Sequence, residues 1–148
     1  MPDDKVPAFF TIFNEIGIIA QLARSAFEER LPDGMILPHF SVLNHLIRVK
    51  DGQTPLVMAR AFQVPKTTLT HTLAGLEKGG YVDMRTNPQD ARSKCVWITE
   101  SGRKFRNDAI ADISAVFAPI EGQLAEDWAE RVLPELIDLR KILDAARS

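Results

Sequence analysis

The chain has 148 residues and contains the segment QVPKTTLTHTLAGLEKGG at positions 63–80. Its leucines recur at intervals of four and three residues, so they share one stripe of an α-helix: Leu69, Leu73 and Leu76. The opposite face is small and polar, and it consists of Thr67, Thr70, His71, Ala74 and Lys78. Gly79-Gly80 ends the helix, because glycine readily adopts the left-handed conformation found there. This face suits close contact with a partner rich in donors and acceptors, but a solvated Thr-rich helix would have the same pattern.

The preceding residues predict a second, shorter helix in contact with the first. Thr54-Pro55 is a favourable start, with threonine as the N-cap and proline at the first helical position, and the helix extends over about 55–62. Gln63-Val64-Pro65 then forms a tight connection, although it lacks the usual glycine. The two helices and this turn form a helix-turn-helix pattern.

After Gly80 the spacing of apolar residues changes from helical to alternating. Residues 81–85 and 94–98 each read as a β-strand, and the polar residues 86–93 between them contain several turn formers. The expected product is a β-hairpin attached directly to the helix-turn-helix, which is a winged helix.

Helices are also predicted on both sides of this region. Residues 8–30 have apolar side chains in steps of three or four, and a second helix opens near Pro38 and ends before Lys50. After the hairpin, a helical region begins at Thr99 to Gly102, where Thr99 or Ser101 could be the cap, and its apolar side chains extend over 103–124. A last helix begins at a capping box, Asp127 to Glu130. The 69 residues of 38–106 are too few to cover the apolar faces of both terminal regions. We therefore expect a homodimer in which 8–30 and 107–146 are dimerisation helices.

Composition and charge narrow the class of protein. No apolar run approaches the ~18–20 residues that a membrane span needs, and the acidic N-terminus lacks the features of a secretory signal. One cysteine, Cys95, excludes an intrachain disulfide and fits a reducing cytoplasm. The net charge of −2 hides a split: residues 38–106 carry 11 Lys and Arg against 5 Asp and Glu, whereas the remainder carries 7 against 15. A basic middle between acidic ends is expected when one module meets phosphate.

Over nearly the whole chain, this order of elements resembles the MarR (multiple antibiotic resistance regulator) family. The residues that carry the resemblance are KTTLTH at 66–71, LEKGGYV at 76–82, NPQDARSK at 87–94 and ITESG at 98–102. The last two are similar to the family's Asp-x-Arg wing and the Leu-Thr-x-x-Gly that follows it. The chain departs from the family pattern at Pro65, where Asp or Ser is frequent, and at His71, where Arg is common. The resemblance implies one MarR-like domain over 1–148, mainly α with a small β-hairpin wing, with the winged-helix DNA-binding region at 38–106.

The candidate DNA-binding residues lie on the polar helix and on the hairpin. Threonine hydroxyls near a helix N-terminus bind phosphate, and their methyl groups can touch a thymine methyl. Arg92 is expected to enter a minor groove with Asp90 bracing its guanidinium, although a solvated ion pair at a hairpin tip is the simpler alternative. The full set is Lys66, Thr67, Thr68, Thr70, His71, Arg85, Asp90, Arg92 and Lys94.

Other residues that carry reactive or metal-binding groups point to no further chemistry. Cys95 has no second cysteine to resolve a sulfenate, so we interpret it as a packing residue and not as a redox sensor. His39, His45 and His71 do not have the spacing of a metal site and are interpreted as structural or pocket-lining residues. We expect no metal and no cofactor. With no nucleophile–base arrangement, phosphate-binding glycine loop or spaced carboxylate pair, the chain is not expected to be an enzyme.

Together these patterns predict a transcriptional regulator that binds a pseudo-palindromic DNA operator as a homodimer. The resemblance further implies a repressor, and a small, aromatic or phenolic ligand that binds between the dimerisation helices and the winged helix and releases the DNA. The competing hypothesis is a winged helix that serves as a protein-interaction module without operator binding. The operator, the regulated genes, the sign of regulation and the effector cannot be read from the residues.

Overall fold

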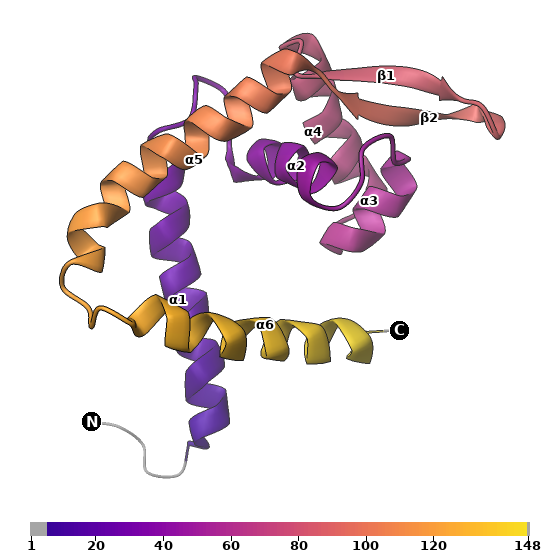
Figure 1. The fold of residues 1–148 in the computed structure, drawn as a ribbon. Coiled ribbons are helices and arrows are strands. Elements are labelled where there is room, and N and C mark those ends of the chain that lie inside the picture. Colours follow the sequence, from indigo (N-terminus) through magenta and orange to yellow (C-terminus); the bar gives the residue numbers. More distant parts are fainter. Residues whose placement is uncertain (1–5, 148) are drawn as a thin grey trace. The chain divides into compact units, whose positions relative to one another are not determined.

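The computed structural model describes residues 6–147. Its elements are, in chain order, α1 (Ala8–Glu28), α2 (Leu37–Arg48), α3 (Pro55–Phe62), α4 (Lys66–Lys78), β1 (Val82–Asn87), β2 (Asp90–Ile98), α5 (Glu100–Glu121) and α6 (Trp128–Ala146) (Figure 1). They divide into two compact units, one ending at Ile113 and the other beginning at Ser114, so that α5 starts in the first and finishes in the second. Residues 1–5, which include the segment read above as lacking a secretory signal, lie outside the described part.

The core of the first unit is built from the helix-turn-helix and the hairpin. Figure 1 shows α2, α3 and α4 grouped together, with the β1–β2 hairpin extending away from them. The buried residues of this core come from α2, α3, α4, both strands and α5: Val42, Leu43, Leu46, Met58, Ala59, Leu69, Leu73, Leu76, Val82, Val96 and Phe105. The mainly helical fold with a two-stranded wing is therefore confirmed.

The helix-turn-helix forms where the sequence predicts it, for local reasons. The Thr54 hydroxyl accepts a hydrogen bond from the Val57 amide at 3.4 Å, and Pro55 occupies the first turn of α3. Gln63 takes the left-handed position after α3 with φ of 55°, the conformation that a glycine would adopt more easily. Gly80, with φ of +78°, adopts the predicted left-handed conformation after α4.

The hairpin is longer than predicted, and the expectation that 86–93 form a loop is wrong. β1 pairs antiparallel with β2 from Val82↔Ile98 to Thr86↔Lys94, and then Asn87 pairs with Asp90. Only Pro88 and Gln89 remain between the strands, so Asp90 and Arg92 belong to β2. The turn formers indicated a loop, but hydrogen bonds of the Asn87 side chain to the Gln89 amide and the Ser93 hydroxyl hold a narrow tip instead.

The start of α5 agrees with its predicted cap, whereas the start of α6 corrects a prediction. α5 begins at Glu100, and the Thr99 hydroxyl accepts a hydrogen bond from the Gly102 amide at 3.1 Å, so Thr99 is the one of the two predicted caps that is used. The predicted capping box at Asp127 is absent: its carboxylate makes no cap hydrogen bond and lies 3.1 Å from the Arg131 guanidinium. No residue of α1 or α6 is buried, and both helices expose large apolar side chains. None of the helices in residues 6–147 combines the length and apolar character that a membrane span requires.

Candidate nucleic-acid interface

The outer face of α4 is free, as the leucine spacing predicts. Leu69, Leu73 and Leu76 are only 2%, 3% and 0% exposed. The predicted contacts on α4 are all exposed to solvent: Lys66, Thr67, Thr68, Thr70 and His71. α4 is therefore oriented as a recognition helix, the term used below for this element.

The N-terminus of the recognition helix suits an anion. Pro65 is the N-cap and offers no side chain that could accept a hydrogen bond from the first turn. The first turn also contains no acidic residue, and Lys66 stands at its start. Because the first amides of a helix have no intrahelical partner and lie at the positive end of its dipole, they can bind a phosphate oxygen. The proline that departs from the family pattern thus leaves these amides available.

The hairpin of β1 and β2 is called the wing below. Its tip presents Arg92, which is hydrogen-bonded to Asp90. Because Thr86 pairs with Lys94 and Asn87 with Asp90, residues 91–93 bulge out of the ladder. Asp90 Oδ1 accepts hydrogen bonds from the Arg92 amide at 3.0 Å and from Arg92 Nε at 3.1 Å. The Arg92 side chain is nevertheless 92% exposed, so the aspartate orients the guanidinium without covering it.

The same contacts affect the charge of the tip. Hydrogen bonds from the Arg92 side chain and backbone lower the pKa of Asp90, so the carboxylate stays charged under ordinary conditions. The Ser93 hydroxyl donates to the Asp90 carbonyl at 3.2 Å and accepts from the Asn87 side chain at 3.1 Å. These bonds hold Asp90 and Arg92 in one arrangement before any partner arrives.

The remaining predicted residues lie along the wing. Arg85 on β1 is exposed, with its guanidinium 3.6 Å from the Asp83 carboxylate and 5.4 Å from the centre of the Trp97 ring. Lys94 is exposed on β2 opposite Thr86. The predicted residues therefore form two groups on one unit, five on the recognition helix and four on the wing. Gly79, Gly80 and Tyr81 connect the groups in the chain.

The residues that attach the wing to the helices have no signal for this contact in the sequence. Gln53 in the α2–α3 loop forms a β-bridge with Val96, and the Asp51 carboxylate accepts a hydrogen bond from the Ile98 amide. Asp51-Gly52 had a local signal only as a turn at the end of a helix. Nothing in the spacing showed that a residue 47 positions later would donate to its side chain.

Two of the three histidines are buried, as expected for structural residues, and His71 is exposed. Burial lowers the pKa of His39, and the nearby charge of His71 lowers it further. The His39 ring accepts a hydrogen bond from the Ile36 amide at Nδ1, which requires the neutral ring. Cys95 is buried in β2. Within residues 6–147, no three His, Cys, Asp or Glu side chains are placed to hold a metal ion.

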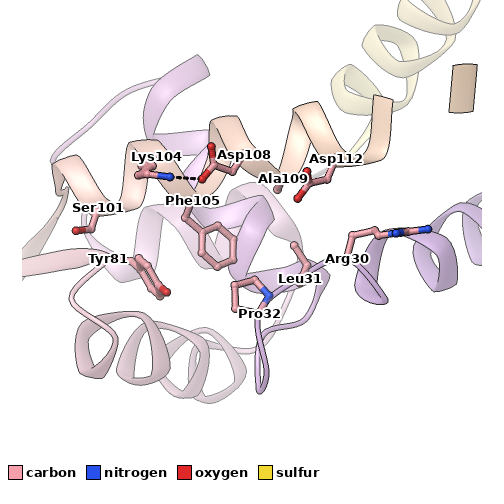
Figure 2. A pocket seen from close by; sticks show the side chains of 10 residues that line it. All are labelled: Arg30, Leu31, Pro32, Tyr81, Ser101, Lys104, Phe105, Asp108, Ala109 and Asp112. Carbon is pink, nitrogen blue, oxygen red and sulfur yellow. Dashed lines mark hydrogen bonds and ion pairs between the residues drawn. The ribbon is translucent and has the colours of Figure 1, made fainter. Parts of the chain in front are cut away.

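A cavity of about 480 Å³ is lined by the loop after α1, by Tyr81 and by the first part of α5 (Figure 2). The rings of Tyr81 and Phe105 lie edge to face in it, with centroids 4.8 Å apart, beside Leu31 and Pro32. Its polar lining comes from Arg30, Ser101, Lys104, Asp108 and Asp112. Lys104 donates to Asp108 at 2.6 Å. A volume of this size accommodates a small organic molecule.

Comparison with known proteins finds similar sequences and similar folds. Residues 33–93 match the MarR family model. The chain is 28% identical over 133 residues to the transcriptional regulator HosA of Escherichia coli O111:H-, an alignment that covers 90% of this chain and 95% of HosA.

Solved structures show the same fold at lower identity. The transcriptional regulator BldR of Sulfolobus solfataricus superposes with a TM-score of 0.78 at 22% identity, covering 97% of this chain and 99% of BldR. CouR of Rhodococcus jostii RHA1, bound to p-coumaroyl-CoA, has a TM-score of 0.69 at 22% identity, covering 86% of this chain and 90% of CouR. An exposed recognition helix, a wing with a braced arginine and these matches agree: the winged-helix region matches the MarR family model, and the chain is similar in sequence to a transcriptional regulator and shares the fold of solved transcriptional regulators.

Proposed function

We propose that the chain acts as a homodimeric repressor that binds a pseudo-palindromic operator and leaves it when a small molecule binds. The observation that carries this proposal is the pairing of two surfaces on one unit. The recognition helix and the wing both present exposed groups that bind phosphates and base edges, and both belong to the basic middle of the chain. As a DNA-binding regulator, the protein would act in the cytoplasm.

Each group of residues has a separate role in this proposal. Thr67, Thr70 and His71 would meet base edges in the major groove, while Lys66 and the amides beside it, with the exposed Thr68, would bind phosphate. On the wing, the exposed Arg92 would enter the adjacent minor groove. Arg85 and Lys94 would contact the phosphates that border it, and Asp90 would act only through Arg92.

Dimerisation would use the two terminal regions, 8–30 and 107–146. α1 has no buried residue although it carries Phe9, Phe10, Ile19 and Leu22, and α6 likewise buries none of its residues. Two-fold packing of these surfaces would cover them in both copies. It would also place two recognition helices about one DNA turn, ~34 Å, apart, which explains why we expect an operator with pseudo-two-fold symmetry.

The effector would bind in the cavity of Figure 2, with an aromatic ring against Tyr81 and Phe105. CouR, which has this fold, is bound to p-coumaroyl-CoA, a molecule with a phenolic ring. Tyr81 directly follows the glycine that ends the recognition helix, and Phe105 belongs to α5. A ligand between these residues would change how the recognition helix and the wing meet α5, and would so weaken the grip on DNA.

Selection of bound sequences from a random duplex pool, followed by footprinting, tests the operator proposal. The expected result is a pseudo-palindrome of two half-sites, and an affinity for duplex whose logarithm falls linearly with the logarithm of salt concentration. A protein-interaction module would show neither result. Release of the selected operator by aromatic acids and phenols then tests the effector. In that assay Lys104→Ala alters the cavity lining without touching the recognition helix, and the exposed Lys141→Ala on α6 is the control.

A further inference from the structure

The loop between α2 and α3 is joined to the wing by an isolated β-bridge between Gln53 and Val96. The Val96 carbonyl accepts a hydrogen bond from the Gly52 amide at 2.9 Å, and the Val96 amide donates to the Gln53 carbonyl at 2.8 Å. Val96 also pairs with Met84 across the hairpin. β2 therefore lies between β1 and the loop, and the wing is joined to the helices through more than its own two ends.

Asp51 strengthens this join with its side chain. Its Oδ1 accepts hydrogen bonds from the Ile98 amide at 2.9 Å and from the Gly52 amide at 3.1 Å. Ile98 is the last residue of β2, so the carboxylate holds the strand at the point where it leaves the sheet. A half-buried carboxylate that accepts two backbone donors is fixed in position, because charge-assisted bonds of this kind are the stronger ones.

The same loop is attached to the helices on its other side. The Gln53 side-chain oxygen lies 2.6 Å from Nε2 of His45, a buried residue of α2. The His45 ring in turn packs against Phe62 of α3, with centroids 5.1 Å apart. The wing is therefore connected to α2 and α3 through five loop residues, from Lys50 to Thr54.

Packing beside Asp51 links this loop to a predicted DNA contact. Gly52 has φ of +73°, and a Cβ added there would lie 2.5 Å from the Trp97 ring, so the loop backbone rests directly on that ring. The Arg85 guanidinium lies 5.4 Å from the centre of the same ring. The loop thus supports Trp97, and Trp97 supports Arg85.

We propose that Asp51 is a positioning residue for DNA binding: it sets the angle at which the wing presents Arg85 and Arg92, and it touches no DNA itself. This inference rests on the proposed function of the wing. It makes a prediction opposite in sign to simple electrostatics. Removing a negative charge from a DNA-binding protein should strengthen its binding. Removing Asp51 should instead weaken it.

The test is a double-mutant cycle on the full-length protein with the selected operator. Asp51→Ala and Arg92→Ala should each lower the affinity about tenfold, and the double variant should lose little more than either one, because both act through the wing. Asp51→Asn keeps an acceptor oxygen and should restore most of the affinity. Asp33→Ala, which removes an exposed loop carboxylate, is the charge control and should not weaken binding.

Amide hydrogen exchange without DNA shows whether the join itself behaves as described. Asp51→Ala should speed exchange of the Ile98 and Val96 amides and leave those of the recognition helix unchanged. Additive losses in the cycle, or tighter binding by Asp51→Ala, would overturn the inference. If Arg92→Ala alone leaves the affinity unchanged, the proposed role of the wing fails. The exchange result would then show that the join exists but does not serve DNA binding.

Discussion

α4 and α1 are both helices with a regular apolar stripe, but the stripe of α4 is buried and that of α1 is exposed. The three leucines of α4 are at most 3% exposed, because α2, α3 and β1 pack around them. In α1, Phe9 is 62% exposed and Leu22 is 67% exposed, and the helix has no buried residue. One stripe therefore belongs to the core of the first unit, and the other is exposed.

Apolar spacing therefore predicts a helix and its apolar face, but it does not predict what covers that face. Burial of an apolar side chain is favourable whether the cover comes from the same chain or from a second copy. α1 exposes six large apolar side chains: Phe9, Phe10, Ile12, Ile18, Ile19 and Leu22. A monomer rarely exposes so much apolar surface on one element, and this supports the dimer interface proposed above.

The largest effect is expected from charges placed on the exposed stripe. Ile19→Asp with Leu22→Asp should convert the proposed dimer to a monomer, because two-fold symmetry counts each lost side chain twice. At about 1.5–3 kcal/mol for each buried side chain, the pair would cost roughly 6 kcal/mol or more of association free energy. Light scattering across a range of concentrations measures this, with the polar exposed residue Gln21→Asp as the control. If the wild-type protein is already a folded monomer at micromolar concentration, the proposed dimer interface on α1 is wrong.

A cavity in the buried stripe should have the next largest effect, and of a different kind. Leu76 is fully buried, so Leu76→Ala should lower the free energy of unfolding by about 2–5 kcal/mol. Its loss should persist when the protein is diluted, because the cover comes from the same chain. Urea unfolding at two protein concentrations separates this variant from the α1 variants, whose effect on apparent stability should depend on concentration.

Substitutions on the free face of the recognition helix and at the wing tip should change DNA binding while leaving stability nearly unchanged. His71→Ala, Thr67→Ala and Arg92→Ala should each cost roughly 1–3 kcal/mol of operator binding. Arg92→Ala should also reduce the salt slope by about one and flatten any A·T preference beside the half-sites. Asp90→Ala should give a smaller loss of the same kind, since it removes only the brace. A salt titration and footprinting measure these effects.

Melting temperatures serve as the check on that set. A variant such as Thr67→Ala that lost several degrees but kept its affinity would show that α4 packs with its other face inward. An Arg92→Ala protein with an unchanged slope and an unchanged flanking preference would reduce Arg92 to a solvated charge.

The smallest expected effect is a dependence of stability on pH that comes from the buried His39. Burial lowers the pKa of His39 below its ordinary value of 6.5. As the pH falls, this histidine is therefore protonated at a higher pH in the unfolded chain than in the folded chain. Stability should be complete above about pH 6.5 and should fall as the pH drops toward the folded pKa. His39→Gln should flatten this part of the profile. Thermal unfolding between pH 5 and 8 tests it, and an unchanged slope in the variant would assign the dependence to other groups.

The hairpin includes residues whose strand pairing could not be predicted from the sequence. The apolar residues correctly located the inner halves of both strands: exposure alternates along the start of β1, and Cys95 and Val96 are buried in succession in β2. They missed the outer halves, where Arg85, Thr86 and Lys94 are all exposed and alternation disappears. There the ladder continues because Asn87 and Ser93 bond across the tip, and no pattern in the residues marks such a pairing.

The order of neighbouring residues predicts the helix-turn-helix, the capped start of α3, the end of α4 at glycine and the outward orientation of its polar face. Each of these features depends on interactions between residues that lie within a few positions of one another. The attachment of the wing depends on Asp51 and Ile98, the cavity on Tyr81 and Phe105, and the lowered pKa of His39 on burial within the folded unit. Those features combine residues from separate elements. Only the packed chain brings them within hydrogen-bonding or van der Waals distance, so the tertiary structure decided them.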